Sequence, residues 1–251
     1  LQLGDVAFSL YEKFPSTSVK ITDLLAFEKE GFDNDTLFYA KATYIELSIL
    51  DILFNKIDIK KVVVSEGEIN ITYNTDNNPN FTVFKTSEAN KNQLSLKKML
   101  LLNTSIEYQT KNIDIDLQTA QAMLVFQEQK LSINTSLFSK KLEIHSRDYI
   151  NNKNMKLLAT LSLQKDSVFI QRGSKVHIED VIFELSGSIL QSNTIDLDFS
   201  CKAQELAEVM NHTPEHLNSI YKSFQANGEL SCKGNIKGLI SKENNPALNM
   251  S

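Results

Sequence analysis

The chain of 251 residues contains no tryptophan, only 8 glycines and 4 prolines, and 2 cysteines. Two cysteines cannot form the disulfide framework on which small secreted domains depend. The scarcity of glycine and proline argues against many tight turns, and a hydrophobic content of 41% argues against disorder. The composition therefore indicates an ordered, strand-rich protein that is large enough to form its own core.

The chain also lacks an excess of positive charge and any long apolar run. Its net charge of -5 and pI near 5.5 argue against a nucleic-acid partner, because phosphate binding depends on clustered lysine and arginine. No signal peptide is evident, and no apolar stretch reaches the roughly 20 residues that a membrane-spanning helix needs.

The common catalytic motifs are missing as well. The sequence has no G-x-S-x-G elbow, no phosphate-binding G-x-x-x-x-G-K-[ST] loop and no G-x-G-x-x-G turn. The paired carboxylates Asp114 with Asp116, and Asp196 with Asp198, alternate with apolar residues and so belong to the solvated face of a strand. We therefore predict that the protein is not an enzyme and has no cofactor.

One stretch matches a zinc-binding motif in sequence, but its expected local structure does not fit zinc binding. His212, Glu215 and His216 match H-x-x-E-H, in which two histidines one helical turn apart bind zinc. Pro214 fits the first turn of a helix and not its interior, so His212 falls outside the helix that contains His216. We predict no metal site here, and a zinc hydrolase remains a distant alternative.

What the sequence has in abundance is strict alternation of apolar and polar residues. Between residues 36 and 73 this alternation slips once, between Ile59 and Val62, where a β-bulge is expected. Strands are predicted at 4–11, 18–27, 36–47, 56–64, 67–73, 94–102, 104–109, 111–117, 119–127, 130–137, 141–146, 155–164, 166–171, 175–190 and 194–201.

Two stretches change to helical spacing. Ala203, Leu206, Ala207 and Met210 follow one another at i, i+3, i+4 and i+7, and the same spacing returns between Leu217 and Phe224. The predicted fold is thus mainly β: an elongated, twisted, mostly antiparallel sheet that forms a groove, with two short helices near 203–225. We treat 1–251 as a single region whose one candidate internal boundary is 75–92.

Cys201 and Cys232 each stand at an apolar position of a predicted strand. Cys201 ends the apolar series Ile195, Leu197, Phe199, and Cys232 follows Leu230. They are predicted to be buried thiols, and a disulfide between neighbouring strands is the alternative if the compartment is oxidising.

Several stretches resemble the AsmA family of bacterial envelope proteins, which is related to bridge-like lipid-transfer proteins. The resemblance lies in GDVAFSL and FPSTSVKITDL within 3–24, in the strand, Leu-rich turn and I-x-I-x-K-V-x-V order of 36–73, and in the glycines Gly228, Gly234 and Gly238 of the C-terminal pattern. It implies an inner-membrane anchor helix upstream of this segment and a periplasmic location in a Gram-negative bacterium. It also implies a role in outer-membrane maintenance, with phospholipid as the partner and other envelope proteins as further partners.

If the sheet forms a groove for lipid, its lining should come from the alternating apolar residues of the central strands. The predicted lipid-binding residues are Ile57, Ile59, Ile69, Ile71, Leu94, Leu96, Ile113, Ile115, Leu161, Leu163, Ile195 and Leu197. The alternative is a structural or protein-binding module whose apolar face is closed by its own sheet.

Overall fold

A computed structural model describes residues 1–9, 16–32, 35–48, 58–76, 78–81, 95–190, 194–206, 209, 228–239 and 246–250. These residues form a mainly β structure, a mostly antiparallel open sheet, as the alternation predicted. The described part of the chain contains no helix long and apolar enough to cross a membrane. Contacts divide the chain into two compact units, Leu1–Val125 and Phe126–Ser251, which we describe in turn.

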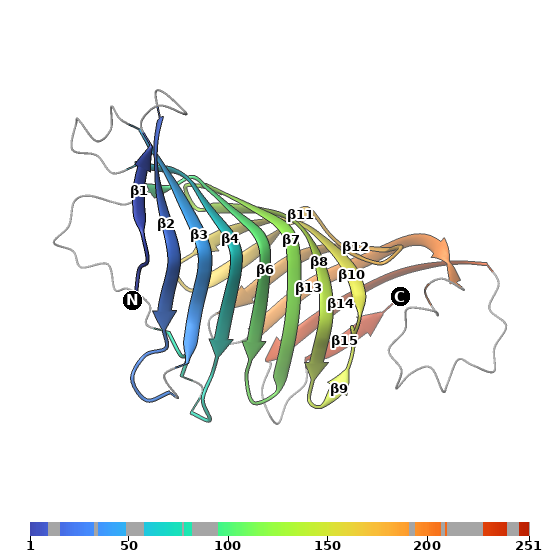
Figure 1. The fold of residues 1–251 in the computed structure, drawn as a ribbon. Helices are drawn as coiled ribbons and strands as arrows, with labels where there is room; N and C mark the ends of the chain where they lie inside the picture. Colours follow the sequence, from blue (N-terminus) through green and yellow to red (C-terminus); the bar gives the residue numbers. More distant parts are fainter. Residues whose placement is uncertain are drawn as a thin grey trace. The chain divides into compact units, whose positions relative to one another are not determined.

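Unit 1 is built from long strands that lie side by side (Figure 1). They are β1 (Val6–Ser9), β2 (Ser16–Phe27), β3 (Thr36–Ser48), β4 (Asp58–Thr72), β5 (Ser95–Leu96), β6 (Lys98–Gln109) and β7 (Ile113–Gln127). Pairing runs β1-β2-β3-β4-β6-β7, with β5 also beside β4. All of these pairs are antiparallel except those of β4 with β5 and β6, which are parallel.

The predicted slip of alternation corresponds to a shift of register between β3 and β4. Leu47 lies opposite Ile59 whereas Glu46 lies opposite Lys61, so Lys60 is an additional residue on β4. An additional residue moves every later side chain of a strand to the other face. The shift therefore keeps Ile59 and Val62 on the same face despite their odd spacing.

A second irregularity crosses the middle of unit 1. Asp23, Glu66 and Asn103 have left-handed φ values of 46°, 51° and 47°, and Glu66 and Asn103 both fall between the register pairs Ser65–Leu102 and Gly67–Thr104 of β4 and β6. We call these three residues the left-handed row. Since Val64 and a Cβ added to Gly67 would meet at 2.9 Å, positions 64 and 67 face the same side, and the alternation of β4 slips at Glu66.

Two members of the left-handed row, Asp23 and Glu66, contact side chains of β3. Lys41 of β3 makes an ion pair with Glu66 at 2.7 Å, and the Tyr39 hydroxyl donates to a carboxylate oxygen of Asp23 at 3.1 Å. These contacts lie on the exposed side of the sheet, where they offset part of the cost of a left-handed backbone in residues other than glycine.

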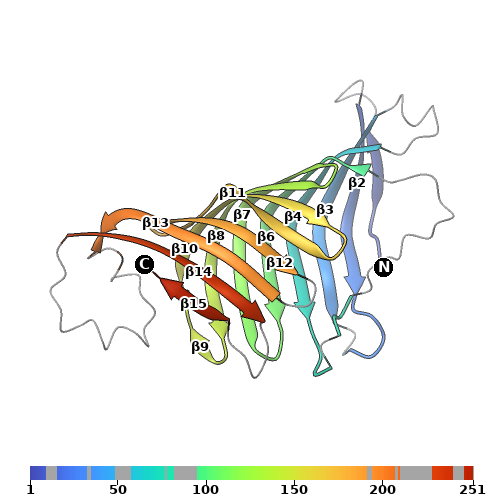
Figure 2. The ribbon, with the colours of Figure 1, turned by 180° about the vertical axis from the view of Figure 1, so that it is seen from behind.

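Unit 2 is again a sheet of neighbouring antiparallel strands, which Figure 2 shows from behind. Its strands are β8 (Lys130–Ile144), β9 (Arg147–Asp148), β10 (Lys153–Gln164), β11 (Ser167–Ile178), β12 (Val181–Leu190), β13 (Thr194–Glu205), β14 (Glu229–Leu239) and β15 (Ala247–Met250). They pair in the order β8-β10-β11-β12-β13-β14-β15, and β9 pairs with β8.

The register of unit 2 is interrupted within β11. Pairing of β11 with β12 shifts between Ile170 and Ser174, and its pairing with β10 shifts between Ile170 and Lys175. Gly173, which has a φ of 89°, lies in both intervals. Glycine adopts this conformation without the steric cost that a Cβ brings. The bend in unit 2 is thus placed at a glycine of one strand.

Several predicted strand boundaries were wrong. The predicted strands 56–64 and 67–73 are a single strand, β4, because the chain continues through Glu66 in a left-handed conformation instead of turning. Likewise 94–102 and 104–109 are joined in β6, which begins at Lys98, and 111–117 and 119–127 are joined in β7, which begins at Ile113. Conversely, the predicted strand 175–190 is divided by a turn between Ile178 and Val181, where Glu179 has a φ of 49°.

The two predicted helices near 203–225 fall mostly outside the described residues. Within that range, residues 203–205 belong to the end of strand β13. His212 and His216 also lie outside the described residues.

Candidate apolar binding face

In unit 1 the register places apolar residues in rows that run across one face of the sheet. Residues that stand opposite each other on paired strands lie on the same face, so the rows can be read from the pairing of β3, β4, β6 and β7. They are Ile45–Val62–Met99–Leu124, Thr43–Val64–Leu101–Ala122, Ala40–Gly67–Thr104–Thr119, Phe38–Ile69–Ile106–Leu117 and Ile71–Tyr108–Ile115. No residue in these rows is charged, so this face of unit 1 is suited to apolar contact.

The centre of this face is closely packed. Ala40, Val64, Leu101 and Ala122 form a buried cluster, against which Leu24, Phe38, Val62, Ile69, Met99 and Leu124 pack. The row that contains Ala40 of this cluster consists of small residues, and position 67 is crowded, because a Cβ there would come within 2.9 Å of Val64 and 3.2 Å of Thr104. Towards the two ends of the strands the same face is only half-buried.

The predicted lining residues of unit 1 that the structure describes lie on this apolar face. Ile59 stands opposite Leu47 and Leu96, and Ile71 shares a row with Ile115. Ile69 packs against the buried cluster, and Ile113 lies two residues before Ile115 on the same strand. Ile57 and Leu94 lie outside the described residues.

An aromatic pair lies at one end of the face. The rings of Tyr73 and Tyr108 are 5.8 Å apart between centroids, and Tyr108 stands between Ile71 and Ile115 in their row. Burial raises the pKa of Tyr108 above its ordinary value, with a smaller contribution from Tyr73. The phenol therefore stays neutral at physiological pH, and the row adds no charge to the face.

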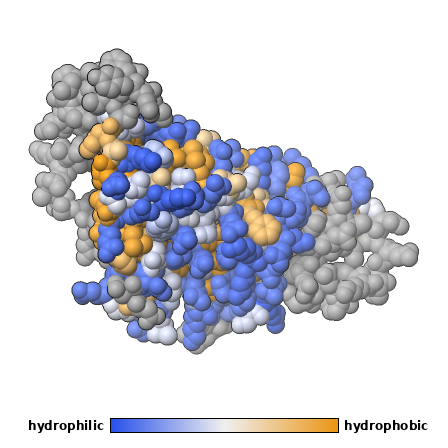
Figure 3. Space-filling model, viewed as in Figure 1, coloured by the Kyte–Doolittle hydropathy of each residue, from blue (hydrophilic) through white to orange (hydrophobic). Residues whose placement is uncertain are grey.

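The opposite side of the same strands carries charges. Glu68, Glu107 and Asp116 occupy positions between the apolar ones on β4, β6 and β7. The carboxylate pair Asp114 and Asp116 belongs to this side, but both residues are half-buried and one carboxylate oxygen of Asp116 is buried, so the prediction of a solvated face holds only in part. Figure 3 shows one face of the molecule, on which hydrophilic residues predominate and hydrophobic ones form smaller groups.

Unit 2 has a corresponding arrangement of its own. The cross-strand rows on one face are Leu137–Met155–Ile178–Val181, Thr135–Leu157–Val176–Phe183–Cys201–Cys232, Leu131–Leu161–Ile170–Gly187–Leu197–Ile236–Leu248 and Leu163–Val168–Ile189–Ile195–Gly238. None of these residues is charged. The four predicted lining residues of unit 2, Leu161, Leu163, Ile195 and Leu197, therefore lie in two adjacent rows.

Exposure along these rows is uneven. Ile195 is 7% exposed and Leu163 is 37% exposed, although both belong to the same row. Ile189 of β12, which stands beside Ile195 in this row, is 40% exposed, so a buried position lies directly next to an exposed one.

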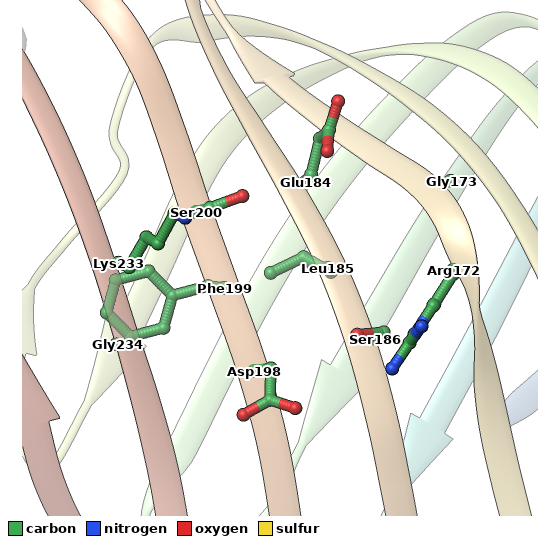
Figure 4. Close-up of a pocket in the computed structure, with 10 residues that line it drawn as sticks. All are labelled: Arg172, Gly173, Glu184, Leu185, Ser186, Asp198, Phe199, Ser200, Lys233 and Gly234. Carbon is green, nitrogen blue, oxygen red and sulfur yellow. The ribbon is translucent and has the colours of Figure 1, made fainter.

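A pocket of about 370 Å³ lies within unit 2, between β11, β12, β13 and β14 (Figure 4). Leu185 points toward β13, whereas the Phe199 ring points away from Leu185 and lies over Gly234 of β14, where a Cβ would come within 2.4 Å of the ring. The other lining residues are mostly polar or charged: Arg172, Gly173, Glu184, Ser186, Asp198, Ser200 and Lys233. The pocket combines charges of both signs.

The second predicted carboxylate pair, Asp196 and Asp198, lies on the polar side of β13. Asn235 donates hydrogen bonds to both carboxylates, and Lys237 makes an ion pair with Asp196. Lys237 first, then Asn235, holds the pKa of Asp196 below its ordinary value. These side-chain contacts link β13 to β14 on the surface of the sheet, so their role is structural.

Sequence reasoning overlooked much of the apolar face. Met99, Leu101, Leu124 and Phe183 lie in further rows of the same faces, and Ile236 lies in the row of the predicted residues Leu161 and Leu197. Their alternation with polar neighbours was visible, and the signal that would have selected them is the register between strands, which a single sequence does not reveal.

Within the described ranges, no group of three or more histidine, cysteine, aspartate or glutamate side chains is placed to hold a metal ion. Comparison with protein-family models, curated proteins and solved structures finds no match to this chain.

Proposed function

We propose that this protein is a non-enzymatic, AsmA-like envelope protein that holds or conducts phospholipid along the apolar face of its sheet. The observation that carries the proposal is the set of uncharged cross-strand rows, which continue over neighbouring strands while the charged residues stand on the other side. In unit 1 every described element belongs to one sheet, so no described element of that unit packs over this face as a second layer.

The energetics favour a lipid as the occupant. Moving acyl chains through water costs about 0.8 kcal/mol for each CH₂ group, which amounts to on the order of 20 kcal/mol for two chains. A continuous face without charge removes most of this cost, because acyl chains move along it without leaving an apolar environment. Acyl chains have no polar groups, so a face that binds them needs no polar or charged side chains, and the rows contain no charged residue.

The resemblance of 3–24, 36–73 and the C-terminal glycine pattern to the AsmA family supplies the cellular setting of the proposal. In that setting the protein is anchored in the inner membrane by a helix outside this segment. It acts in the periplasm of a Gram-negative bacterium, where it helps to maintain the outer membrane. Other envelope proteins are its expected partners.

The buried cluster around Val64 and Leu101 favours a second candidate. Val64 is 3% and Leu101 6% exposed, as in the interior of a closed protein. A structural or protein-binding module with a closed core would have such side chains over its whole face, whereas Ile71 and Ile115 are only half-buried. The two candidates therefore differ at the ends of the strands.

The test is the amount of phospholipid that the purified protein carries. We expect protein extracted from a bacterial envelope in mild detergent to contain bound phospholipid, measured by mass spectrometry of the extracted lipid. Ile71→Asp places a charge on the apolar face and should reduce binding by about thirtyfold to a hundredfold, because a poorly solvated charge costs about 2–3 kcal/mol.

Thr72→Asp is the matched control. Thr72 is the next residue of β4, is also half-buried, and stands on the polar side opposite Gln109. This variant should keep its lipid. Wild-type protein free of lipid, or equal loss in both variants, would contradict the proposal.

A further inference from the structure

The two cysteines of the chain stand directly opposite each other. Cys201 of β13 is the register partner of Cys232 of β14. Opposed residues of antiparallel strands have Cα atoms about 4.5–5.5 Å apart, and disulfides span Cα distances of about 4.4–6.8 Å. The backbone therefore already provides the separation that a disulfide requires.

The side chains also lie on one face. Both cysteines continue the row of Val176 and Phe183, on the apolar side of unit 2. Both thiols are free in this structure. Burial, and to a smaller extent the nearby Cys232 thiol, raise the pKa of Cys201.

The two thiols differ in access. Cys201 is 3% exposed, and its thiol donates to the Lys202 carbonyl oxygen at 3.4 Å, whereas Cys232 is half-buried. A pocket of about 530 Å³ is lined by both cysteines together with Glu184, Ser200, Lys202, Ser231 and Lys233. A small reagent that enters this pocket meets Cys232 more readily than Cys201.

We propose that Cys201 and Cys232 form a redox pair that a small disulfide oxidant converts into a disulfide across β13 and β14. The Cys232 thiolate attacks the oxidant, and a mixed disulfide forms at its Sγ while one half of the oxidant leaves as a thiolate. The Cys201 thiolate then attacks the Sγ of Cys232 and expels the second half. The two cysteine thiols lose two electrons and two protons, and the oxidant is reduced to two thiols.

The disulfide would constrain the longest connection between paired strands in unit 2. About 30 residues separate Cys201 from Cys232, and the register of β13 with β14 shifts just beyond them, between Cys201 and Gln204. Closing this segment removes conformational freedom from the unfolded chain. The disulfide therefore stabilises the end of the strand pair from which this segment departs.

The experiment uses oxidised glutathione as the oxidant and intact-protein mass spectrometry as the readout. The wild-type protein should lose both thiols and gain no glutathione, and peptide mapping should identify a link between Cys201 and Cys232 within one chain. Its melting temperature should rise by on the order of 10 °C, and a reductant should reverse the change.

The single variants separate the two roles. Cys201→Ser should accumulate a stable mixed disulfide with one glutathione at Cys232, while Cys232→Ser should react far more slowly. Thiols that persist in the folded wild type but react after denaturation in urea would overturn the pair. Disulfides between chains, or trapping by Cys232→Ser instead of Cys201→Ser, would overturn the proposed geometry and order of attack.

Discussion

The two units each build an uncharged sheet face, but they fill its buried positions differently. In unit 1 the buried apolar residues Ala40, Val64, Leu101 and Ala122 form one cluster. In unit 2 the most buried side chain is that of Ser139, whose hydroxyl donates to the Ile150 carbonyl oxygen at 2.8 Å. Unit 1 also buries polar side chains, among them Asn80 and Thr104. The units therefore differ in that the buried apolar residues of unit 1 meet in one cluster, whereas those of unit 2, such as Val181, Cys201 and Ile195, lie in different cross-strand rows.

The units also bend in different ways. Unit 1 places Asp23, Glu66 and Asn103 in left-handed conformations on several strands, while unit 2 shifts the register of one strand around Gly173. When neighbouring strands bend at the same level, their residues stay in register, and the cross-strand rows of unit 1 therefore continue on one face past the bend. A bend in one strand interrupts the rows locally, and in unit 2 Ser174 supplies hydrogen bonds at the interruption.

The largest effect is expected from a charge in the cluster of unit 1. Val64→Asp buries an unpaired carboxylate at a position that is 3% exposed, and should lower the free energy of unfolding by about 4 kcal/mol or more. Urea denaturation measures this loss. Ser65→Asp, the next residue on the polar side, should cost less than about 1 kcal/mol. Equal losses in the two variants would mean that the faces are not distinct.

The second largest loss of stability is expected from a cavity in the buried cluster of unit 1. Leu101→Ala should cost about 2–5 kcal/mol, because its side chain is 6% exposed and its neighbours are packed around it. The comparison variant is Leu161→Ala in unit 2, where the half-buried side chain should cost about 1–2 kcal/mol. A larger loss at Leu161 than at Leu101 would reverse the proposed difference between the units.

A buried hydroxyl tests the dependence of unit 2 on polar contacts. Ser174→Ala removes the bond that Ser174 donates to the Gln171 carbonyl oxygen at 2.8 Å and the one it accepts from the Thr160 amide at 3.2 Å. The expected loss is about 1–3 kcal/mol, since two backbone groups lose their partner. Exposed Ser132 provides the control, because Ser132→Ala should change stability by less than about 0.5 kcal/mol. Hydrogen exchange should quicken at Thr160 only in the first variant.

The smallest effect is expected from the surface ion pair of Asp196 with Lys237. A carboxyl whose pKa is lowered in the folded state stabilises the protein above its ordinary pKa of 3.8 and loses that effect as the pH falls through the lowered value. The melting temperature of Asp196→Asn should therefore lie slightly below that of the wild type near neutral pH, and the difference should vanish in strong acid. A difference that grew with acidification would contradict the lowered pKa. The pair is exposed, so its effect should also weaken in high salt.

The sequence predicted the apolar face of each unit better than the boundaries of the strands. Strict alternation is enough to assign Ile71, Ile115 and Leu197 to apolar positions, and the slip at Lys60 was visible as an odd spacing. The left-handed conformation of Glu66 was not foreseen, because Glu66-Gly67 resembles a turn in the sequence. Only the contacts with neighbouring strands keep these two residues within the single strand β4. The parallel pairing of β4 with β6 was not foreseen either, since pairing between distant segments has no local pattern.

The cysteines illustrate the same limit. Alternation placed Cys201 and Cys232 at apolar positions, as their shared row with Phe183 confirms. Their direct opposition depends on the register of β13 and β14, and a shift of one residue would have separated them. The candidate disulfide therefore emerges from the register and not from the spacing of the cysteines in the sequence.

The central claim is that acyl chains lie against the apolar face, and photocrosslinking tests it most directly. A phospholipid with a photoreactive group within its acyl chain would be bound to the protein and irradiated, and the modified residues mapped by mass spectrometry. The account predicts adducts at apolar-face residues such as Ile71, Ile115 and Leu163, and none at Glu68 or Asp114 on the polar side. Adducts on both sides alike, or an absence of adducts in protein that carries the lipid, would contradict it.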